Sequence, residues 1–152
     1  MAEEAKPTPS VQLITTYIKD VSFENIGLQN NYVAKKQPKF EMNLNINNKV
    51  VEGDIVEVSL NVKIKAEEGD QTIFMMDLEH AGRFILKDVV DDQRVPFLYI
   101  ECPRLLFPYT RRIISGMTLD GGLMPLNLDH IDFVKMFQNS VEAARAKAAE
   151  KN

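Results

Sequence analysis

The sequence has few of the residues from which disulfide frameworks, metal sites and membrane spans are built. Its 152 residues include one cysteine, two histidines and no tryptophan. The single Cys102 leaves no disulfide within the chain, as is typical of a reducing compartment. No apolar run approaches the roughly 18 residues of a membrane-spanning helix, and residues 1–10 carry acids and prolines in place of a signal peptide. We therefore expect a cytoplasmic protein without membrane insertion.

Motifs for catalysis and nucleotide binding are also missing. The glycine pair at 121–122 lacks the spacing of a phosphate-binding loop and its Lys followed by Ser or Thr. His80 and His130 are far apart, and neither has a second ligand at helical spacing, which argues against a metal site. Asp77 and Glu79 lie close to His80 in sequence, but on a strand His80 points to the opposite face. We expect no catalytic residue, no cofactor and no metal, and therefore no enzyme.

The charge is negative and unevenly distributed. The formal net charge is −4, and residues 1–102 hold 17 acidic and 11 basic side chains, whereas residues 103–152 hold five acidic and seven basic. An acidic first part argues against nucleic-acid binding, because phosphate contacts need clustered Lys and Arg. A mildly acidic surface instead suits a basic protein partner.

Four stretches of the chain alternate apolar and polar residues with the period of a half-buried strand. They are residues 11–24, 40–47, 56–65 and 74–80, and Gly82 is expected to end or bend the last of them. Short or moderate connections between them predict an antiparallel meander with one apolar face that must be covered.

Helices are predicted in the remaining part of the chain. Residues 94–102 suit a short helix, although a strand is also compatible with them, and a longer helix is expected to begin at 106 or 107 so that Pro108 falls in its first turn. Asp132 is a suitable N-cap for a last helix. The fold class is therefore α+β, a four-stranded antiparallel sheet with helices on one face. We expect one domain at 11–140, with a disordered segment at 1–10 and a frayed helix end at 141–152.

The polar faces of the first and last predicted strands are rich in acids. Asp20 and Glu24 share one face of the first strand, and Met75, Asp77 and Glu79 share one face of the fourth. If the two strands lie in one sheet, these residues form an acidic patch that contains an exposed methionine. Ordinary solvated carboxylates are the alternative explanation.

Large apolar side chains are more frequent than one sheet face requires. Ile14, Ile18 and Ile73 fall on the polar faces of their strands, which suggests that part of that surface is covered. An ordinary core is one explanation of the further excess after residue 98, and an oligomer interface with an adaptable apolar groove is the other. The side chains in this excess are Tyr99, Ile100, Leu105, Leu106, Phe107, Tyr109, Leu123, Met124, Leu126 and Leu128.

Several segments, in order along the chain, resemble the SecB family of protein-export chaperones. They are residues 17–24 (YIKDVSFE), 57–62 (EVSLNV), 102–115 (CPRLLFPYTRRIIS), 120–122 (DGG) and 131–133 (IDF). The resemblance implies an ATP-independent holdase that binds unfolded precursor proteins and delivers them to the SecA motor ATPase. It also implies a homotetramer, a dimer of dimers with long helices sandwiched between sheets.

The resemblance also implies roles for particular residues. The motor-docking patch of the family falls on Asp20, Glu24, Met75 and Asp77. The positions at which the family packs its subunits together fall on Phe74, Met76, Leu78 and His80.

A holdase selects unfolded chains by the apolar side chains that they expose, so it needs an apolar groove. We expect this client-binding groove to be lined by Phe40, Met42, Leu44, Leu105, Leu106, Phe107 and Tyr109. Two alternative functions remain open, a SecB-like chaperone of a toxin–antitoxin system and a small-molecule-binding domain.

Overall fold

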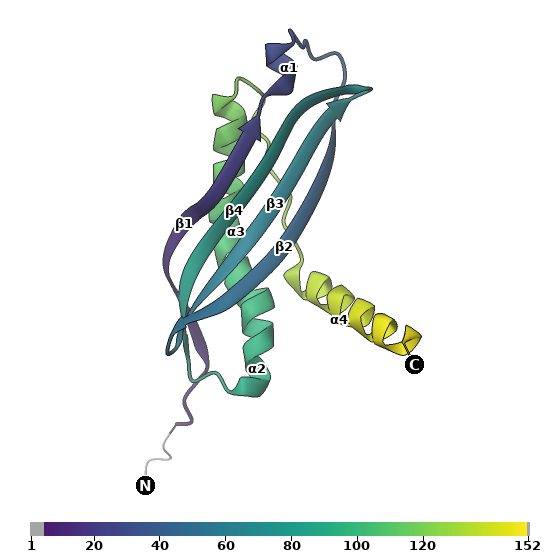
Figure 1. Ribbon diagram of the computed structural model, residues 1–152. Helices are drawn as coiled ribbons and strands as arrows, with labels where there is room; N and C mark the ends of the chain where they lie inside the picture. Colours follow the sequence, from purple (N-terminus) through teal and green to yellow (C-terminus); the bar gives the residue numbers. More distant parts are fainter. Residues whose placement is uncertain (1–4, 152) are drawn as a thin grey trace.

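The alternating segments form one twisted antiparallel sheet in a computed structural model that describes residues 5–151 (Figure 1). Its strands are β1 (Ser10–Glu24), β2 (Lys39–Glu52), β3 (Ile55–Glu68) and β4 (Gln71–Lys87). Their order across the sheet is β1-β4-β3-β2, so β1 and β2 are the two edges. The predicted fold class is confirmed, but the predicted meander holds only for β2 to β4.

The long connection between β1 and β2 explains this difference. It contains the short helix α1 (Ile26–Gln29) and a stretch without regular structure up to Pro38, and it carries the chain around one end of the sheet (Figure 1). Gly53 and Gly69, at φ of 55° and 60°, form the tight turns of the β2–β3 and β3–β4 hairpins. The hairpins fix β2, β3 and β4 as neighbours, and β1 pairs with the free edge of β4.

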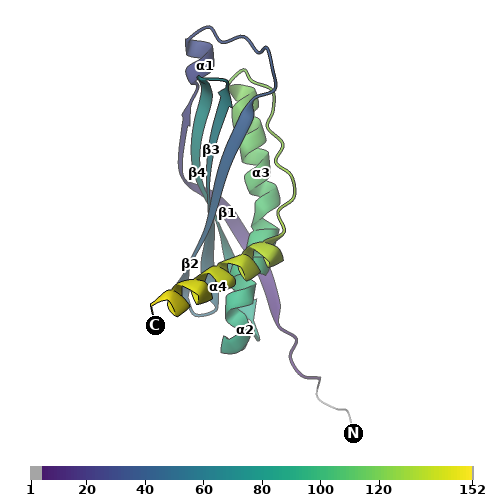
Figure 2. The same ribbon diagram turned by 90° about the vertical axis from the view of Figure 1, so that its right-hand side faces the viewer.

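One continuous helical rod covers a single face of the sheet. It consists of α2 (Asp91–Pro96), a π-helical turn (Phe97–Glu101) and α3 (Cys102–Asp120). Figure 2 shows α3 on one side of the sheet, which is seen nearly edge-on. The prediction of a helix that starts at 106 or 107 is therefore wrong, because Pro108 lies inside α3. Pro108 is on an exposed side of the helix, where water can hydrate the backbone carbonyl that the proline leaves unbonded.

The last helix, α4 (Phe133–Glu150), projects away from this body (Figures 1 and 2). The predicted cap is confirmed, because the Asp132 carboxylate accepts a 3.0 Å hydrogen bond from the Lys135 amide. An edge-on contact of Phe133 with Phe107 and a stacked contact of Phe137 with Tyr99 attach its first turns.

The ends of the chain bear on the predicted domain limits. Of the segment 1–10, residues 1–4 lie outside the described residues, residues 5–9 have no helix or strand, and Ser10 begins β1. Of the segment 141–152, residues up to Glu150 are helical and residue 152 lies outside the described part. Among residues 5–151, no helix has the length and apolar character of a membrane span.

The core lies between the sheet and α3. Its members share one face of β3 and β4, or the inward side of α3. They include Val58, Leu60, Val62, Ile64, Leu78, Phe84, Cys102, Leu106 and Ile114. Burial of the Cys102 thiol raises its pKa to about 12, so the thiol is protonated at neutral pH.

The four residues assigned by resemblance to a subunit interface belong to this core. Phe74, Met76, Leu78 and His80 are each at most 3% exposed within the single chain, on the sheet face toward α3. Other side chains of the same chain therefore cover them, and their part in a subunit interface stays a prediction. His80 has the partner that a buried polar ring needs, since its Nδ1 lies 2.7 Å from the hydroxyl of Thr110.

Burial predicts a pH-dependent stability that originates at His80. Desolvation lowers the pKa of His80, and the positive charge of Arg112 lowers it further. The unfolded chain therefore binds a proton at His80 more readily than the folded chain does, starting at the ordinary pKa of about 6.5. The free energy of unfolding should fall as the pH is lowered from about 6.5 toward the folded-state pKa.

Substitution of the ring tests this expectation. His80→Gln keeps a hydrogen-bonding group beside Thr110 and removes the titration, so urea unfolding at fixed protein concentration should lose this slope between pH 7 and pH 5. His130→Gln, at an exposed histidine, is the control and should keep the wild-type slope. An unchanged slope in His80→Gln would contradict the assignment.

Candidate functional site

The sheet face opposite α3 carries the predicted acidic patch. Glu24 pairs directly with Met75, and Asp20 pairs with Glu79 across the β1–β4 ladder. Asp77 pairs with Ser22, two positions along the ladder from each of these pairs and therefore on the same face. The structure thus brings Asp20, Glu24, Met75 and Asp77 together on one face of two adjacent strands. Asp20, Glu24 and Met75 are exposed.

Two irregularities in β1 decide which side chains reach this face. The pairing with β4 shifts between Leu13 and Thr15 and again between Ile18 and Asp20. Each extra residue moves the side chains that follow it to the opposite face of the sheet. After the second irregularity, from Asp20 onward, the side chains again lie on the faces that the alternation predicts. Strict alternation along residues 11–24 would place Tyr17 on the apolar face with Val11 and Leu13. Between the two irregularities Tyr17 instead reaches the polar face and donates a hydrogen bond to Glu57.

Basic residues border the acidic patch. On β3, Lys63 pairs with Asp77 and Lys65 pairs with Met75. Asp77 accepts a 2.9 Å hydrogen bond from the Asn61 amide, and Lys65 forms a 2.6 Å ion pair with Glu67. Lys63, Lys65, Met75 and Asp77 line a hollow of about 600 Å³ that spans all four strands. Any partner docked here meets negative charge over β1 and β4 and positive charge over β3.

A separate charged cluster lies toward the other end of the same face. Glu57 is only 5% exposed, and its carboxylate accepts hydrogen bonds from Tyr17 and, at 2.8 Å, from Lys19. Burial raises the pKa of Glu57, but the hydrogen bonds from Lys19 and Tyr17 outweigh it and hold the pKa below its usual value. The cluster connects the edge strand β1 to β3 across β4.

An apolar groove opens at the end of the sheet where β1 stops and β2 starts. α3 crosses the sheet diagonally and ends over β1, where Gly121 lies against the Phe23 ring (Figure 1). Within residues 5–151, the β2 side of this end is therefore covered by segments without regular structure. Segment 32–38 and segment 123–126, which follows α3, form walls of a groove of about 750 Å³.

The floor of the groove is aromatic and aliphatic. Phe40 and Phe74 lie with ring centroids 6.3 Å apart, and Phe23 lies 5.6 Å from Phe74 on the other side. The groove is lined by Tyr32, Ala34, Lys35, Lys36, Gln37, Pro38, Phe40, Ala66, Ile73, Phe74, Leu123, Met124, Pro125 and Leu126. The charged residues in this lining are Lys35 and Lys36.

The predicted client-binding residues do not form one surface. Phe40 lines the groove, and Met42 and Leu44 follow it along β2. Leu106 and Phe107 are 0% and 4% exposed in the core, and neither of them lines this groove. Leu105 and Tyr109 lie on the outward side of α3, so they do not face the sheet.

Sequence reasoning missed most of the groove because its walls have no periodicity. The signal that was available is the excess of large apolar residues at 123–128, of which Leu123, Met124 and Leu126 line the groove. For segment 32–38 no pattern in the sequence indicated its place.

Two further apolar surfaces are left exposed by the residues that the structure describes. Along α3, residues 105, 109, 112, 116 and 119 recur at alternating steps of four and three on one outward stripe, with Leu105, Tyr109 and Leu119 exposed. A side chain added at Gly116 would meet nothing within 4 Å. On the edge strand β1, Ile14 and Ile18 are both exposed.

The third isoleucine of that prediction, Ile73, is covered within the chain itself. It is 3% exposed, and Gly27 of α1 lies against its backbone, with an added Cβ only 3.2 Å from the Ile73 carbonyl oxygen. Gly27 therefore allows α1 to pack closely on the start of β4.

Comparison with protein families gives a match over nearly the whole chain. The family described as "Preprotein translocase subunit SecB" matches residues 4–144. A "Protein-export protein SecB" from Dinoroseobacter shibae is 42% identical over 145 residues, covering 93% of this chain and 83% of the relative. One from Jannaschia sp. is 38% identical over 151 residues, covering 96% and 88%.

A solved structure shares the fold. It is a SecB-like chaperone from Mycobacterium tuberculosis, in complex with a ChAD peptide from the HigA1 antitoxin. The TM-score is 0.65 at 15% sequence identity, covering 80% of this chain and 90% of that chain. At this identity the likeness concerns the fold alone, a four-stranded antiparallel sheet with helices.

Proposed function

The chain belongs to the SecB family, and we propose that this protein-export chaperone holds unfolded precursor proteins in the groove between segments 32–38 and 123–126. The observation that carries the proposal is the apolar groove, with its aromatic floor of Phe40 and Phe74, on a chain with SecB relatives along almost all of its length. We further propose that it acts in the cytoplasm without nucleotide, cofactor or catalysis.

The physical basis is the supply of exposed apolar side chains in an unfolded chain. Burying one large apolar side chain is worth roughly 1.5 to 3 kcal/mol before ordering costs. Several such contacts along a groove can reach micromolar to nanomolar affinity without reading a sequence. Folded proteins present few such side chains, so the selectivity follows from availability.

Export is favoured over the toxin–antitoxin alternative by the relatives. Those near 40% identity are named for protein export, whereas the chaperone in complex with an antitoxin peptide is only 15% identical. That complex supports peptide binding by this fold. A small-molecule-binding domain would instead melt at a higher temperature with its ligand and would not suppress aggregation of an unfolded precursor.

We propose that the acidic patch docks the SecA motor. Asp20, Glu24 and Asp77 offer negative charge around the exposed Met75, so a partner segment needs cations around an apolar contact. Lys63 and Lys65 on the neighbouring strand favour a partner that also carries an acidic group.

We also propose a homotetramer, a dimer of dimers. The outward stripe of α3 has the spacing that lets one helix pack along another, and Gly116 leaves room for close approach. The edge strand β1, with its exposed isoleucines, offers unpaired backbone groups to a second copy. Several grooves in one assembly would add avidity for a long client.

Placing a charge in the groove should remove client holding. Phe40→Asp should weaken binding of a urea-denatured precursor by about tenfold or more, because it removes one large apolar contact. Val50→Asp introduces the same charge on the same strand, at a 61% exposed position outside the groove, and should bind like wild type. Aggregation of the precursor after dilution, followed by light scattering, measures the difference. Equal holding by both variants would refute the groove.

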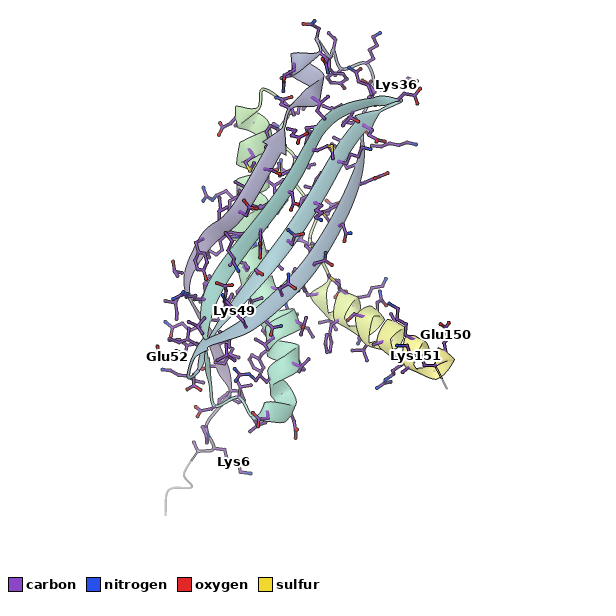
Figure 3. All side chains as sticks on the ribbon, viewed as in Figure 1. Lys6, Lys36, Lys49, Glu52, Glu150 and Lys151 are labelled. Carbon is purple, nitrogen blue, oxygen red and sulfur yellow. The ribbon has the colours of Figure 1, made fainter. Side chains whose placement is uncertain are left out.

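Removing charge from the patch should weaken motor docking alone. Asp20→Ala with Asp77→Ala is expected to lower SecA affinity about twofold to thirtyfold, since surface charge pairs contribute roughly 0.2 to 1 kcal/mol each. The effect should shrink with added salt. Glu52→Ala with Asp54→Ala removes the same charge at the far end of the sheet, where Figure 3 labels Glu52, and serves as the control. Loss of client holding together with docking would contradict separate sites.

A charge on the outward stripe of α3 should divide the assembly. Tyr109 is 47% exposed within one chain, and Tyr109→Asp is expected to convert the tetramer to dimers in native mass spectrometry. Val134→Asp, at an exposed position of α4, is the control and should stay tetrameric. A tetramer that survives Tyr109→Asp would show that α3 does not form the interface.

A further inference from the structure

The wall segment 32–38 is fixed at both ends. After α1, Asn31 adopts a left-handed φ of 59° that turns the chain, and the Tyr32 amide donates a 2.8 Å hydrogen bond to the Gly27 carbonyl. At the other end Lys39 enters β2 and pairs with Glu67 of β3. The residues in between cross the end of the sheet without regular structure (Figure 1).

Glu68 holds the middle of this segment. Its Oε1 accepts hydrogen bonds from two successive backbone amides, from Lys35 at 3.1 Å and from Lys36. Among the described residues, Glu68 is the one side chain for which a hydrogen bond to residues 33–38 is found. Figure 3 shows Lys36 beside the tip at which β3 turns into β4.

The position of Glu68 makes it a firm anchor. It is the last residue of β3, pairs with Gln71 of β4, and is followed by Gly69 in the tight turn. The hydrogen bond of the Tyr32 side chain lowers the pKa of Glu68. Burial raises it, but the amides of Lys36 and Lys35 also lower it, and the pKa stays below its usual value. The group is therefore a carboxylate at neutral pH, and its contacts join the rigid hairpin to the irregular segment.

The residues that Glu68 holds are those that form the groove. Lys35 and Lys36 line the apolar groove, as do Tyr32 and Pro38 on either side of them. The same two lysines and Glu68 also border a hollow on the other side of the segment. The segment is therefore a thin wall, with the client groove on one side and Glu68 on the other.

We propose that Glu68 is a positioning residue for client binding, which ties the wall segment 32–38 to the β3–β4 turn and so sets the width of the groove. This inference rests on the proposed holdase function. A wall that is already ordered needs little further ordering when a client binds, whereas a free wall loses conformational entropy at that moment. Glu68 raises affinity in this way without touching the client.

Three variants separate this role from a general structural one. In Glu68→Ala we expect affinity for a permanently unfolded, carboxymethylated protein to fall about five- to tenfold, because the wall must be ordered on binding. Hydrogen exchange at the Lys35 and Lys36 amides should accelerate. Glu68→Gln keeps an oxygen that accepts from both amides and should restore most of the affinity and protection. Glu67→Ala, at the neighbouring carboxylate that pairs with Lys65, should leave both at wild-type values.

Several results would overturn the proposal. Wild-type affinity in Glu68→Ala with fast exchange at Lys35 and Lys36 would show that wall order does not matter for clients. Slow exchange at these amides in Glu68→Ala would show that Glu68 does not hold the wall segment. If Glu68→Gln bound clients as weakly as Glu68→Ala, the negative charge of Glu68 and not its hydrogen-bond acceptance would be what supports binding. If Glu68→Ala fails to fold, Glu68→Asp, shorter by one methylene, takes its place. A wild-type protein without affinity for the unfolded protein would instead refute the proposed function. Amide exchange at Lys35 and Lys36 would then be the remaining test of whether Glu68 holds segment 32–38.

Discussion

The burial of one sheet face beneath a single helical rod is the contact on which the rest of this structure depends. Because α3 covers only that face, the strands must be apolar on one side and can carry charge on the other. Because α3 crosses diagonally and ends over β1, one corner of the apolar face lacks a helical cover. The acidic patch and the apolar groove are therefore two consequences of the same incomplete layer. A second helix over that corner would remove the groove and leave a closed core.

The part of the fold that follows from period-two alternation was predictable. β2, β3 and β4 contain the segments that their patterns predict, and Asp20 and Glu24 reach the expected face. β4 does not end at Gly82, however, but continues through it to Lys87. Alternation identifies a strand but not the strand with which it pairs. The predicted meander therefore placed β1 beside β2, whereas the structure places it beside β4. Alternation also does not reveal the two bulges of β1, so it places Tyr17 on the apolar face although the side chain lies on the polar face.

The candidate groove was less predictable, for two physical reasons. α3 carries apolar residues both toward the sheet and on its outward stripe. Composition therefore does not distinguish buried Leu106 from exposed Leu105. The walls come from irregular segments, whose positions are set by tertiary contacts such as those of Glu68 with Lys35 and Lys36. Such contacts leave no periodic trace in a sequence.

The two proposed sites are separated by the thickness of one sheet. Phe74, in the floor of the groove, and Met75, in the acidic patch, are consecutive residues of β4 that point to opposite faces. A paired central strand is among the least deformable elements of a protein, so docking a motor on one face will not by itself widen the groove on the other. Release of a client to a motor needs a difference in affinity between two states of the chaperone or the pull of the motor itself. The wall segment 32–38, held by one side chain, is the part of the groove that can differ between two such states with little change in the core.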